Sequence, residues 1–354
     1  MLARFRRPRK TAITVTVPAV TAPAQPLRPR ELAAELMRKL EFKILKRLDG
    51  FLFGDYTGFF YGPSLDLAEV REYQPGDEVR RIDWNVTART GKIHVRQYRE
   101  EKEVTAWLIV DLSASMNFGT RRVLKREEAL EFVGTAASII TRHGDKVGVI
   151  GFNEAGLRIV PPRAGKQQVL RILLELFALS QAAERRLAGR EAGGRREERE
   201  TVKNPNPQAP DHGPSGSLEA ALEHISKTLK RRGLLFVVSD FLSVNSAEEP
   251  PWSRGLRRLA FRHDVIAVRV VDPAERELPQ AGELRLRDPE SGEEIWLDTS
   301  DPRVRRSHAA LVQQREDMLA RVLRSAQVDT LTLTTAQEII EPILKFTLRR
   351  KGRR

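Results

Sequence analysis

Oxygen-bearing side chains follow one apolar stretch of this sequence at single-residue spacing. The run LIVDLSAS carries Asp111, Ser113 and Ser115 at the point where a buried strand would end. A loop that turns over the end of a strand can direct these three side chains at one centre. Hard oxygen ligands suit Mg²⁺ or Mn²⁺ better than a soft metal. The spacing therefore predicts a site for a divalent cation.

Two later segments bring further oxygen ligands. The second apolar run that ends in an acid, LLFVVSDF, carries Asp240, and the segment GPSGSLEAAL starts a helix at Ser217. The carboxyl ends of parallel strands share one edge of a sheet, so groups far apart in sequence can meet there. The predicted metal ligands are Asp111, Ser113, Ser115, Ser217 and Asp240, with Ser215 as the alternative to Ser217. The purely structural alternative is that the aspartates cap helices and the serines satisfy backbone groups.

Strands and helical segments alternate from Val104 onward, which is typical of a parallel sheet wrapped in helices. Strands are expected in VTAWLIV, KVGVIGF, LRIV, LLFVVS, DVIAVRVV and VDTLTL. Helices are expected over 122–143, 167–179, 217–231, 253–261 and 304–325, and a hairpin that turns at 288–292 is expected in LRLRDPESGEEIWL. The pattern predicts an α/β protein.

Several of these segments resemble a known family. GDYTGFFYG, DLAEVREYQPGDEVRRIDWNVTAR and KIHVRQYREEKE are similar to the family called domain of unknown function 58, as are HDVIAVRVVDPAERELP and RDPESGEEIWLD. The D-x-S-x-S loop, the later hydroxyl and the later Asp resemble the metal-ion-dependent adhesion site (MIDAS) of von Willebrand factor A domains. The resemblance implies a doubly wound, mostly parallel sheet of the A type, bound Mg²⁺, and a MoxR-type AAA+ ATPase as partner.

With this resemblance the chain divides into several parts. Residues 1–30 are expected to be a disordered basic arm, and 31–103 an N-terminal helix and a small β-rich module. Residues 104–340 are expected to form the von Willebrand factor A-like domain, interrupted by a flexible insertion at 181–216 that lacks apolar periodicity. Residues 341–354 are expected to be a basic tail.

A second cluster of chemically active residue types lies upstream, in REYQPGDEVRRIDWNVTAR. One interpretation is an ionic network that covers a buried Trp84 and braces the module. The other is a docking surface for the ATPase or for an anion, because Arg binds carboxylate and phosphate in a bidentate manner. The residues concerned are Arg71, Asp77, Arg80, Arg81, Asp83, Trp84 and Arg89.

The composition limits the function classes. The chain has 354 residues, no Cys and a formal net charge of +13. Without Cys there is neither a disulfide nor a thiolate metal site, and no apolar run approaches the roughly 20 residues of a membrane span. We therefore expect a cytoplasmic protein. The basic excess leaves open binding of nucleic acid or an anionic surface through the tails, although no specific nucleic-acid motif is present.

The predicted site favours binding over catalysis. Two carboxylates and neutral hydroxyls leave positive charge on the cation and an open position, which an Asp or Glu of a protein ligand can fill. No His lies in the metal loops to act as a general base, so no catalytic residue is predicted. An Asp-based phosphatase or phosphotransferase is the enzymatic alternative, but its usual second Asp is replaced by Ser113. No P-loop is present, so ATP hydrolysis would come from the partner.

Overall fold

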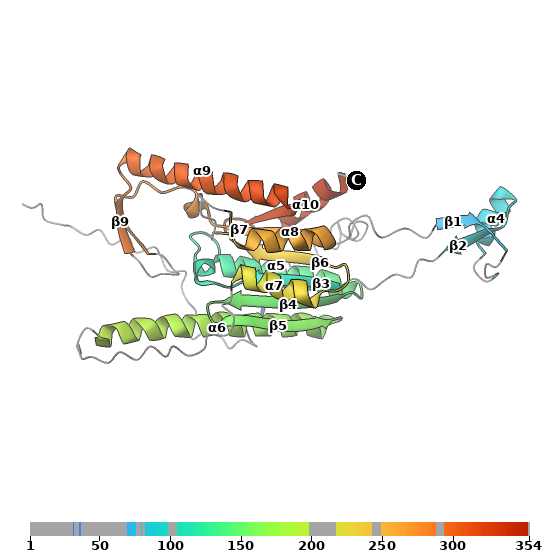
Figure 1. The fold of residues 1–354 in the computed structure, drawn as a ribbon, viewed down its shortest axis with the longest axis horizontal. Helices are drawn as coiled ribbons and strands as arrows, with labels where there is room; N and C mark the ends of the chain where they lie inside the picture. The colour runs from blue at the N-terminus through green and yellow to red at the C-terminus, as the bar shows by residue number, and fades with distance from the viewer. Residues whose placement is uncertain are drawn as a thin grey trace, which may run out of the picture.

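A six-stranded sheet forms the centre of the molecule in the computed structural model (Figure 1). The structure describes residues 31, 35–36, 69–75, 79, 82–97, 105–197, 217–242, 249–287 and 294–352. The strands are β3 (Thr105–Asp111), β4 (Lys146–Asn153), β5 (Gly156–Arg163), β6 (Leu234–Ser239), β7 (Asp264–Val271) and β10 (Asp329–Thr334). They coincide with the six strands that the sequence predicts.

The strand order is β10-β7-β6-β3-β4-β5. All neighbours are parallel except β4 and β5, which pair antiparallel at one edge. The chain starts in the middle with β3, winds outward to β5, and returns to β6 on the other side of β3. This order confirms the predicted doubly wound, mostly parallel α/β fold, and it places the topological switch point between β3 and β6.

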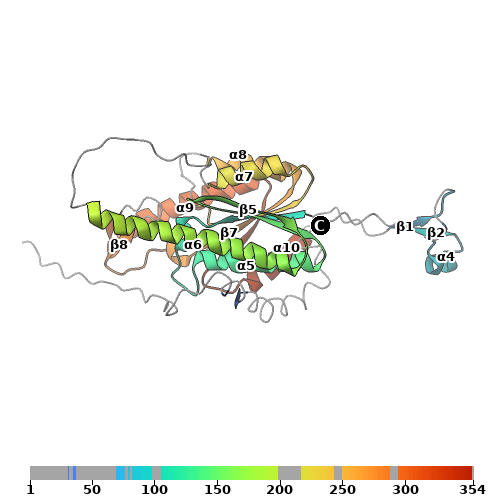
Figure 2. The same ribbon diagram turned by 90° about the horizontal axis from the view of Figure 1, so that it is seen from below.

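Helices cover both faces of the sheet (Figure 2). One face carries α5 (Lys125–Arg142), α6 (Lys166–Glu197) and α10 (Ile340–Gly352). The other carries α7 (Leu218–Thr228), α8 (Trp252–Arg262) and α9 (Pro302–Ser325). The short helices η3 (Ala114–Asn117) and η4 (Pro273–Glu275) follow β3 and β7.

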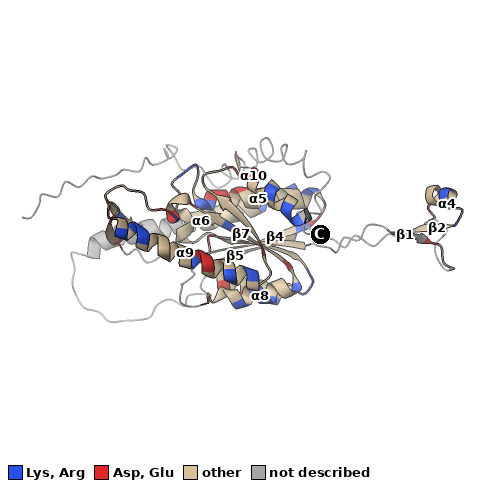
Figure 3. Cartoon of the chain, turned by 90° about the horizontal axis from the view of Figure 1, so that it is seen from above, with Lys and Arg blue, Asp and Glu red and all other residues tan. Residues whose placement is uncertain are grey.

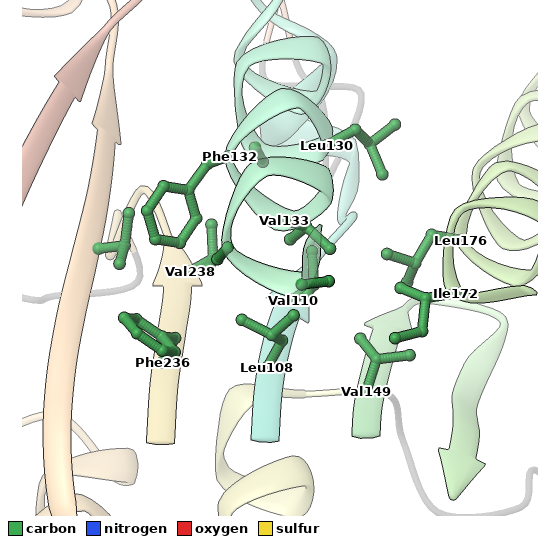
Figure 4. Packing of buried hydrophobic residues seen from close by; sticks show 14 of the residues in the cluster. Leu108, Val110, Leu130, Phe132, Val133, Val149, Ile172, Leu176, Phe236 and Val238 are labelled. Atoms are coloured by element: carbon green, nitrogen blue, oxygen red, sulfur yellow. The ribbon is translucent and has the colours of Figure 1, made fainter. Parts of the chain in front are cut away.

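The residues of β3 show why both faces must be covered. Leu108 and Val110 pack into the core under α5 and α6, where Phe132 and Val133 approach the sheet (Figure 4). Trp107 belongs to the opposite core, under α7 and α8. Because side chains alternate between the faces of a strand, a run that is apolar at every position needs a layer on each side.

Two smaller sheets complete the described chain. Strands β8 (Glu283–Arg287) and β9 (Glu294–Asp298) pair antiparallel, as predicted for the hairpin. Strands β1 (Glu69–Glu72) and β2 (His94–Gln97) also pair antiparallel, and α4 (Trp84–Thr90) lies between them in sequence. Of the predicted N-terminal helix, positions 31, 35 and 36 are described, and they are helical.

Two predicted segments prove wrong. Helix α6 continues to Glu197 and does not end at residue 179, because residues such as Ala, Glu, Gln and Arg favour a helix even without apolar periodicity. The predicted basic tail is part of helix α10, in which Ile343 and Phe346 are buried in the core. Arg350 of the same helix bonds Asp264 and Asp329, so its charge is paired.

Among the described helices, none combines the length and the apolar composition that a membrane span requires.

Candidate metal centre

Asp111 and Asp240 meet at the topological switch point of the sheet. Asp111 is the last residue of β3, and Asp240 follows β6, the parallel neighbour of β3. The register pairs Val110 with Val238, so the two strands end at the same level. In open α/β sheets the crevice at this point is where ligands bind.

Hydrogen bonds join four of the five predicted ligands into one cluster. The Ser115 hydroxyl donates to Oδ2 of Asp240 at 2.8 Å, and the hydroxyls of Ser113 and Ser115 lie 3.1 Å apart. The backbone N–H of Ser113 donates to Oδ1 of Asp111 at 2.9 Å. Ser239 was not predicted, but its hydroxyl donates to Oδ2 of Asp111 at 2.6 Å. The loops after β3 and β6 are therefore linked through the side chains themselves.

The turn after β6 has an unusual backbone. Phe241 has φ of 55°, in the left-handed region that non-glycine residues rarely adopt. Its N–H donates to the Ser239 hydroxyl at 3.0 Å, and its buried ring packs against Trp252 at 5.4 Å between centroids. The N–H of Leu242 donates to Oδ1 of Asp240 at 3.1 Å. This turn fixes the carboxylate of Asp240, and backbone strain of this kind concentrates at functional sites.

Ser217 lies at the amino end of α7. Its hydroxyl accepts a hydrogen bond from the N–H of Ala220 at 3.2 Å, which confirms the predicted helix cap. It forms no hydrogen bond with the four clustered residues in the described part of the chain. Ser215 lies outside the described residues, so the choice between Ser217 and Ser215 stays a prediction.

A buried lysine completes the site, and sequence reasoning missed it. Nζ of Lys125, the first residue of α5, lies 2.7 Å from Oδ2 of Asp240 and 2.5 Å from Oε1 of Glu275. The Lys125 side chain is 0% exposed. The amino end of a helix carries partial positive charge, so a Lys at that position is unfavourable unless an acidic residue pairs with it. This position was the feature of the sequence that could have predicted an acidic partner for Lys125. The ammonium ion and the Ser115 hydroxyl both donate to Oδ2 of Asp240.

The electrostatics of the cluster favour a cation. Burial raises the pKa of Asp111, and the neighbouring charge of Asp240 raises it further, to about 7, although hydrogen bonds from Ser113 and Ser239 act in the opposite direction. Two buried carboxylates that interact in this way repel each other, and among the described residues Lys125 is the cation that forms an ion pair with Asp240. A divalent cation between them would remove the repulsion.

The donor atoms also fit Mg²⁺ or Mn²⁺. Carboxylate and hydroxyl oxygens are hard ligands of the type these ions prefer. Among the described residues, no group of three or more His, Cys, Asp or Glu side chains could hold a metal. Metal binding at this cluster would therefore depend on its serine hydroxyls. Asp111, Ser113, Ser115 and Asp240 are the residues that would hold the ion.

A second buried acid braces the same edge of the sheet. Asp272, after β7, accepts hydrogen bonds from the hydroxyls of Thr120 and Thr335, both at 2.6 Å. Burial alone would raise its pKa, but these hydrogen bonds outweigh burial and lower it. The N–H of Asp272 donates to Glu275 at 3.2 Å, and Glu275 holds Lys125. The loops after β3, β6, β7 and β10 thus form one polar network.

The upstream cluster differs from the prediction at Trp84. Its side chain is 67% exposed, not buried beneath an ionic network. It opens the short helix α4, whose amino end is capped by Asp83 through Oδ1, and a position in the first turn of an isolated short helix has no core to enter. Asp77, Arg80 and Arg81 lie outside the described residues, so the network itself stays a prediction.

Sequence comparison identifies relatives over almost the whole chain. The family model described as "Protein of unknown function DUF58" matches residues 69–318. An uncharacterized protein of Mycobacterium tuberculosis (strain ATCC 25618 / H37Rv) is 35% identical over 340 residues, covering 95% of this chain and 96% of the relative. An uncharacterized protein of Mycobacterium avium is 35% identical over 147 residues, which is 41% of this chain and 83% of the relative.

The similar solved structures include von Willebrand factor A domains. The SpRpn10 VWA domain covers 68% of this chain and 94% of its own, at 10% identity and a TM-score of 0.30. An aerotolerance-related membrane protein from Bacteroides fragilis NCTC 9343, with multiple mutations to serines, covers 71% of this chain and 100% of its own, at 12% identity and a TM-score of 0.38. These overlaps are partial, and the fold described above rests on its own strand order.

Proposed function

Because the chain belongs to the DUF58 family, of unknown function, we propose from its site that it is a non-enzymatic, metal-dependent protein-interaction module. The observation that carries this proposal is the hydrogen-bonded cluster of Asp111, Ser113, Ser115 and Asp240 at the switch point of the sheet. The cofactor would be Mg²⁺, with Mn²⁺ as a substitute.

The residues of the cluster have separate tasks in this function. Asp111 and Asp240 provide the negative charge that attracts the ion, and Ser113 and Ser115 provide neutral oxygens that add no charge. Lys125 holds Asp240 in place through its ion pair and reduces the net negative charge. When bound, the ion supplies a positive centre that a carboxylate oxygen of a partner protein can ligate. The partner's Asp or Glu would then complete the shell of ligands.

The proposed partner is a MoxR-type AAA+ ATPase, for which this chain would be an adaptor in protein maturation or remodelling. The resemblance of the upstream and downstream segments to the DUF58 family supports this choice. The sequence has no P-loop, so the nucleotide chemistry belongs to the partner. A partner that consumes ATP places the proposed activity in the cytoplasm.

Binding of the purified MoxR-type ATPase from the same genome tests this function. The dissociation constant should rise at least about tenfold when EDTA replaces Mg²⁺, and by a similar factor in Asp111→Ala, the loss of roughly one charge-assisted contact. Asp317→Ala, which removes an exposed carboxylate on α9, is the matched control and should leave binding unchanged. Equal affinity in Mg²⁺ and EDTA would exclude a metal-dependent interface.

A further inference from the structure

A basic face runs along α8 to the carboxyl ends of α7 and α8, which lie at the end of the sheet away from the candidate metal centre. Helix α8 contains four arginines and no acidic residue. Arg254, Arg258, Phe261 and Arg262 are all exposed, and at 100° per residue they share one side of the helix. Lys230, Arg231 and Arg232 follow α7 and are also exposed. We call these residues, together with Lys227, the basic face. Figure 3 marks its Lys and Arg positions along α8 in blue.

Most of these charges have no partner within the described protein. Lys227 pairs with Glu223, and Arg258 donates to the Ser226 hydroxyl at 2.7 Å, which ties α8 to α7. The other cations of the face form no hydrogen bond or ion pair with a described residue; they are Lys230, Arg231, Arg232, Arg254 and Arg262. A face of unpaired cations is suited to an external anion.

A cavity of about 240 Å³ opens in this face between the carboxyl ends of the two helices. Lys227, Arg258 and Arg262 line it, together with His263, the apolar side chain of Leu259 and the carboxylate of Glu223, with which Lys227 forms an ion pair at 2.7 Å. Nδ1 of His263 accepts the N–H of Gly233 at 3.2 Å, so the ring proton lies on Nε2 and is available as a donor. The cavity thus presents several N–H donors and fits a small oxyanion such as a phosphate group.

An exposed aromatic ring lies beside the cavity. Phe261 is 91% exposed, and it lies three residues beyond Arg258 on the same side of α8. A large apolar side chain in water gains free energy on entering an apolar phase. A free phosphate ion would occupy the cavity and leave this ring in water. A lipid bilayer would use both features.

We propose that the basic face binds the anionic surface of a lipid bilayer, with a headgroup phosphate in the cavity and Phe261 inserted next to it. The contact is peripheral, because one ring and a set of cations supply it. It is also independent of the metal centre, which lies at the other end of β6, a strand of six residues and therefore about 17 Å away. One end of the sheet would face the membrane while the other binds the protein partner.

Sedimentation of the full chain with vesicles, in EDTA, tests this proposal. We expect binding to phosphatidylcholine vesicles that contain phosphatidylglycerol, and little binding to pure phosphatidylcholine. Arg258→Gln with Arg262→Gln should lower the partition coefficient about 25-fold, since each basic residue contributes roughly a factor of five. Phe261→Ser should lower it about tenfold. Phe261 and Arg262 are exposed, and Arg258 loses only a solvent-exposed hydrogen bond to Ser226, so these variants should melt close to the wild type.

Matched controls separate this face from the general basic charge of the chain. Arg303→Gln with Arg306→Gln removes the same charge from the exposed side of α9, and Leu311→Ser removes an apolar side chain that is 61% exposed. Both controls should bind vesicles within about twofold of the wild type, a difference typical of distant surface changes. An equal loss in the controls, or an unchanged Phe261→Ser, would overturn the proposal. So would face variants that lose affinity only for a single-stranded oligonucleotide.

Discussion

Nζ of Lys125 lies 2.7 Å from Oδ2 of Asp240, and neither side chain is more than 3% exposed. The ammonium ion comes from the start of α5 and the carboxylate from the loop after β6. Removing one member of a buried ion pair leaves the other charged and without compensation, which costs far more than losing an exposed pair. The two residues therefore depend on each other, and the metal loop depends on α5.

Lys125→Met tests this dependence. We expect it to lower the free energy of unfolding by about 3–5 kcal/mol, because the carboxylates of Asp240 and Glu275 lose their shared cation. Urea unfolding measures the effect. Lys227→Met, which breaks an exposed pair with Glu223, should cost at most about 1 kcal/mol. Similar losses in the two variants would mean that Lys125 does not stabilise the site.

Glu316→Gln should change how stability depends on pH. The guanidinium of Arg269 bonds both carboxylate oxygens of Glu316 at 2.5 Å, and these hydrogen bonds, with the charges of Arg269 and Arg276, lower the pKa of Glu316. A carboxyl group with a lowered pKa stabilises the protein above its unfolded pKa of about 4.3 and loses this contribution as pH falls through its folded pKa.

The variant should therefore be less stable than the wild type at pH 7, by about 1–3 kcal/mol for a partly exposed charged hydrogen bond, and the difference should shrink below about pH 4. Unfolding in urea at a series of pH values measures it. Glu341→Gln, at an exposed pair with Lys345, is the control and should show almost no difference. A stability difference that persists at pH 3 would contradict the assignment.

Ser217→Ala tests the predicted ligand that forms no hydrogen bond with the other four. Loss of the α7 cap should lower the free energy of unfolding by about 1 kcal/mol whether or not the residue binds metal. If the hydroxyl is a ligand, Mg²⁺ affinity should also fall about tenfold, and Ser217→Thr should restore both properties. Calorimetric titration with Mg²⁺ measures the affinity. A fall in affinity in Ser215→Ala instead of Ser217→Ala would assign the ligand to Ser215.

The fold was largely readable from the sequence because both cores are built from continuous apolar runs. Strands β3, β4, β6 and β7 carry such runs, and burial on both faces of a parallel sheet requires them. The edge strands β5 and β10 are only partly buried and carry shorter apolar stretches. The two wrong segments lack that signal. Helix α6 extends beyond residue 179 because its residues have high helix propensity. In α10 the buried residues Ile343 and Phe346 are followed by several basic residues, so the segment resembles a solvated tail.

The meeting of Asp111 and Asp240 was also predictable, since each residue lies at the end of an apolar strand. The role of Lys125 was not predictable, because a lysine in an amphipathic helix is normally expected on the solvent-exposed side. Its burial follows only from the positions of its acidic partners. Glu275 follows Lys125 by 150 positions and Asp240 follows it by 115, and only the sheet topology brings them together. Ser239 was not predicted for a related reason: its hydroxyl can reach Asp111 only because β6 pairs with β3.

Calorimetric titration of MgCl₂ into the EDTA-treated full chain tests the central claim most directly. The wild type should bind one Mg²⁺ with saturable heat. Asp111→Asn should give no binding heat, yet unfold in EDTA at the same temperature as the wild type or higher, because it removes one of two repelling buried carboxylates. Absence of binding heat in the wild type, or the same heat in Asp111→Asn, would contradict the account.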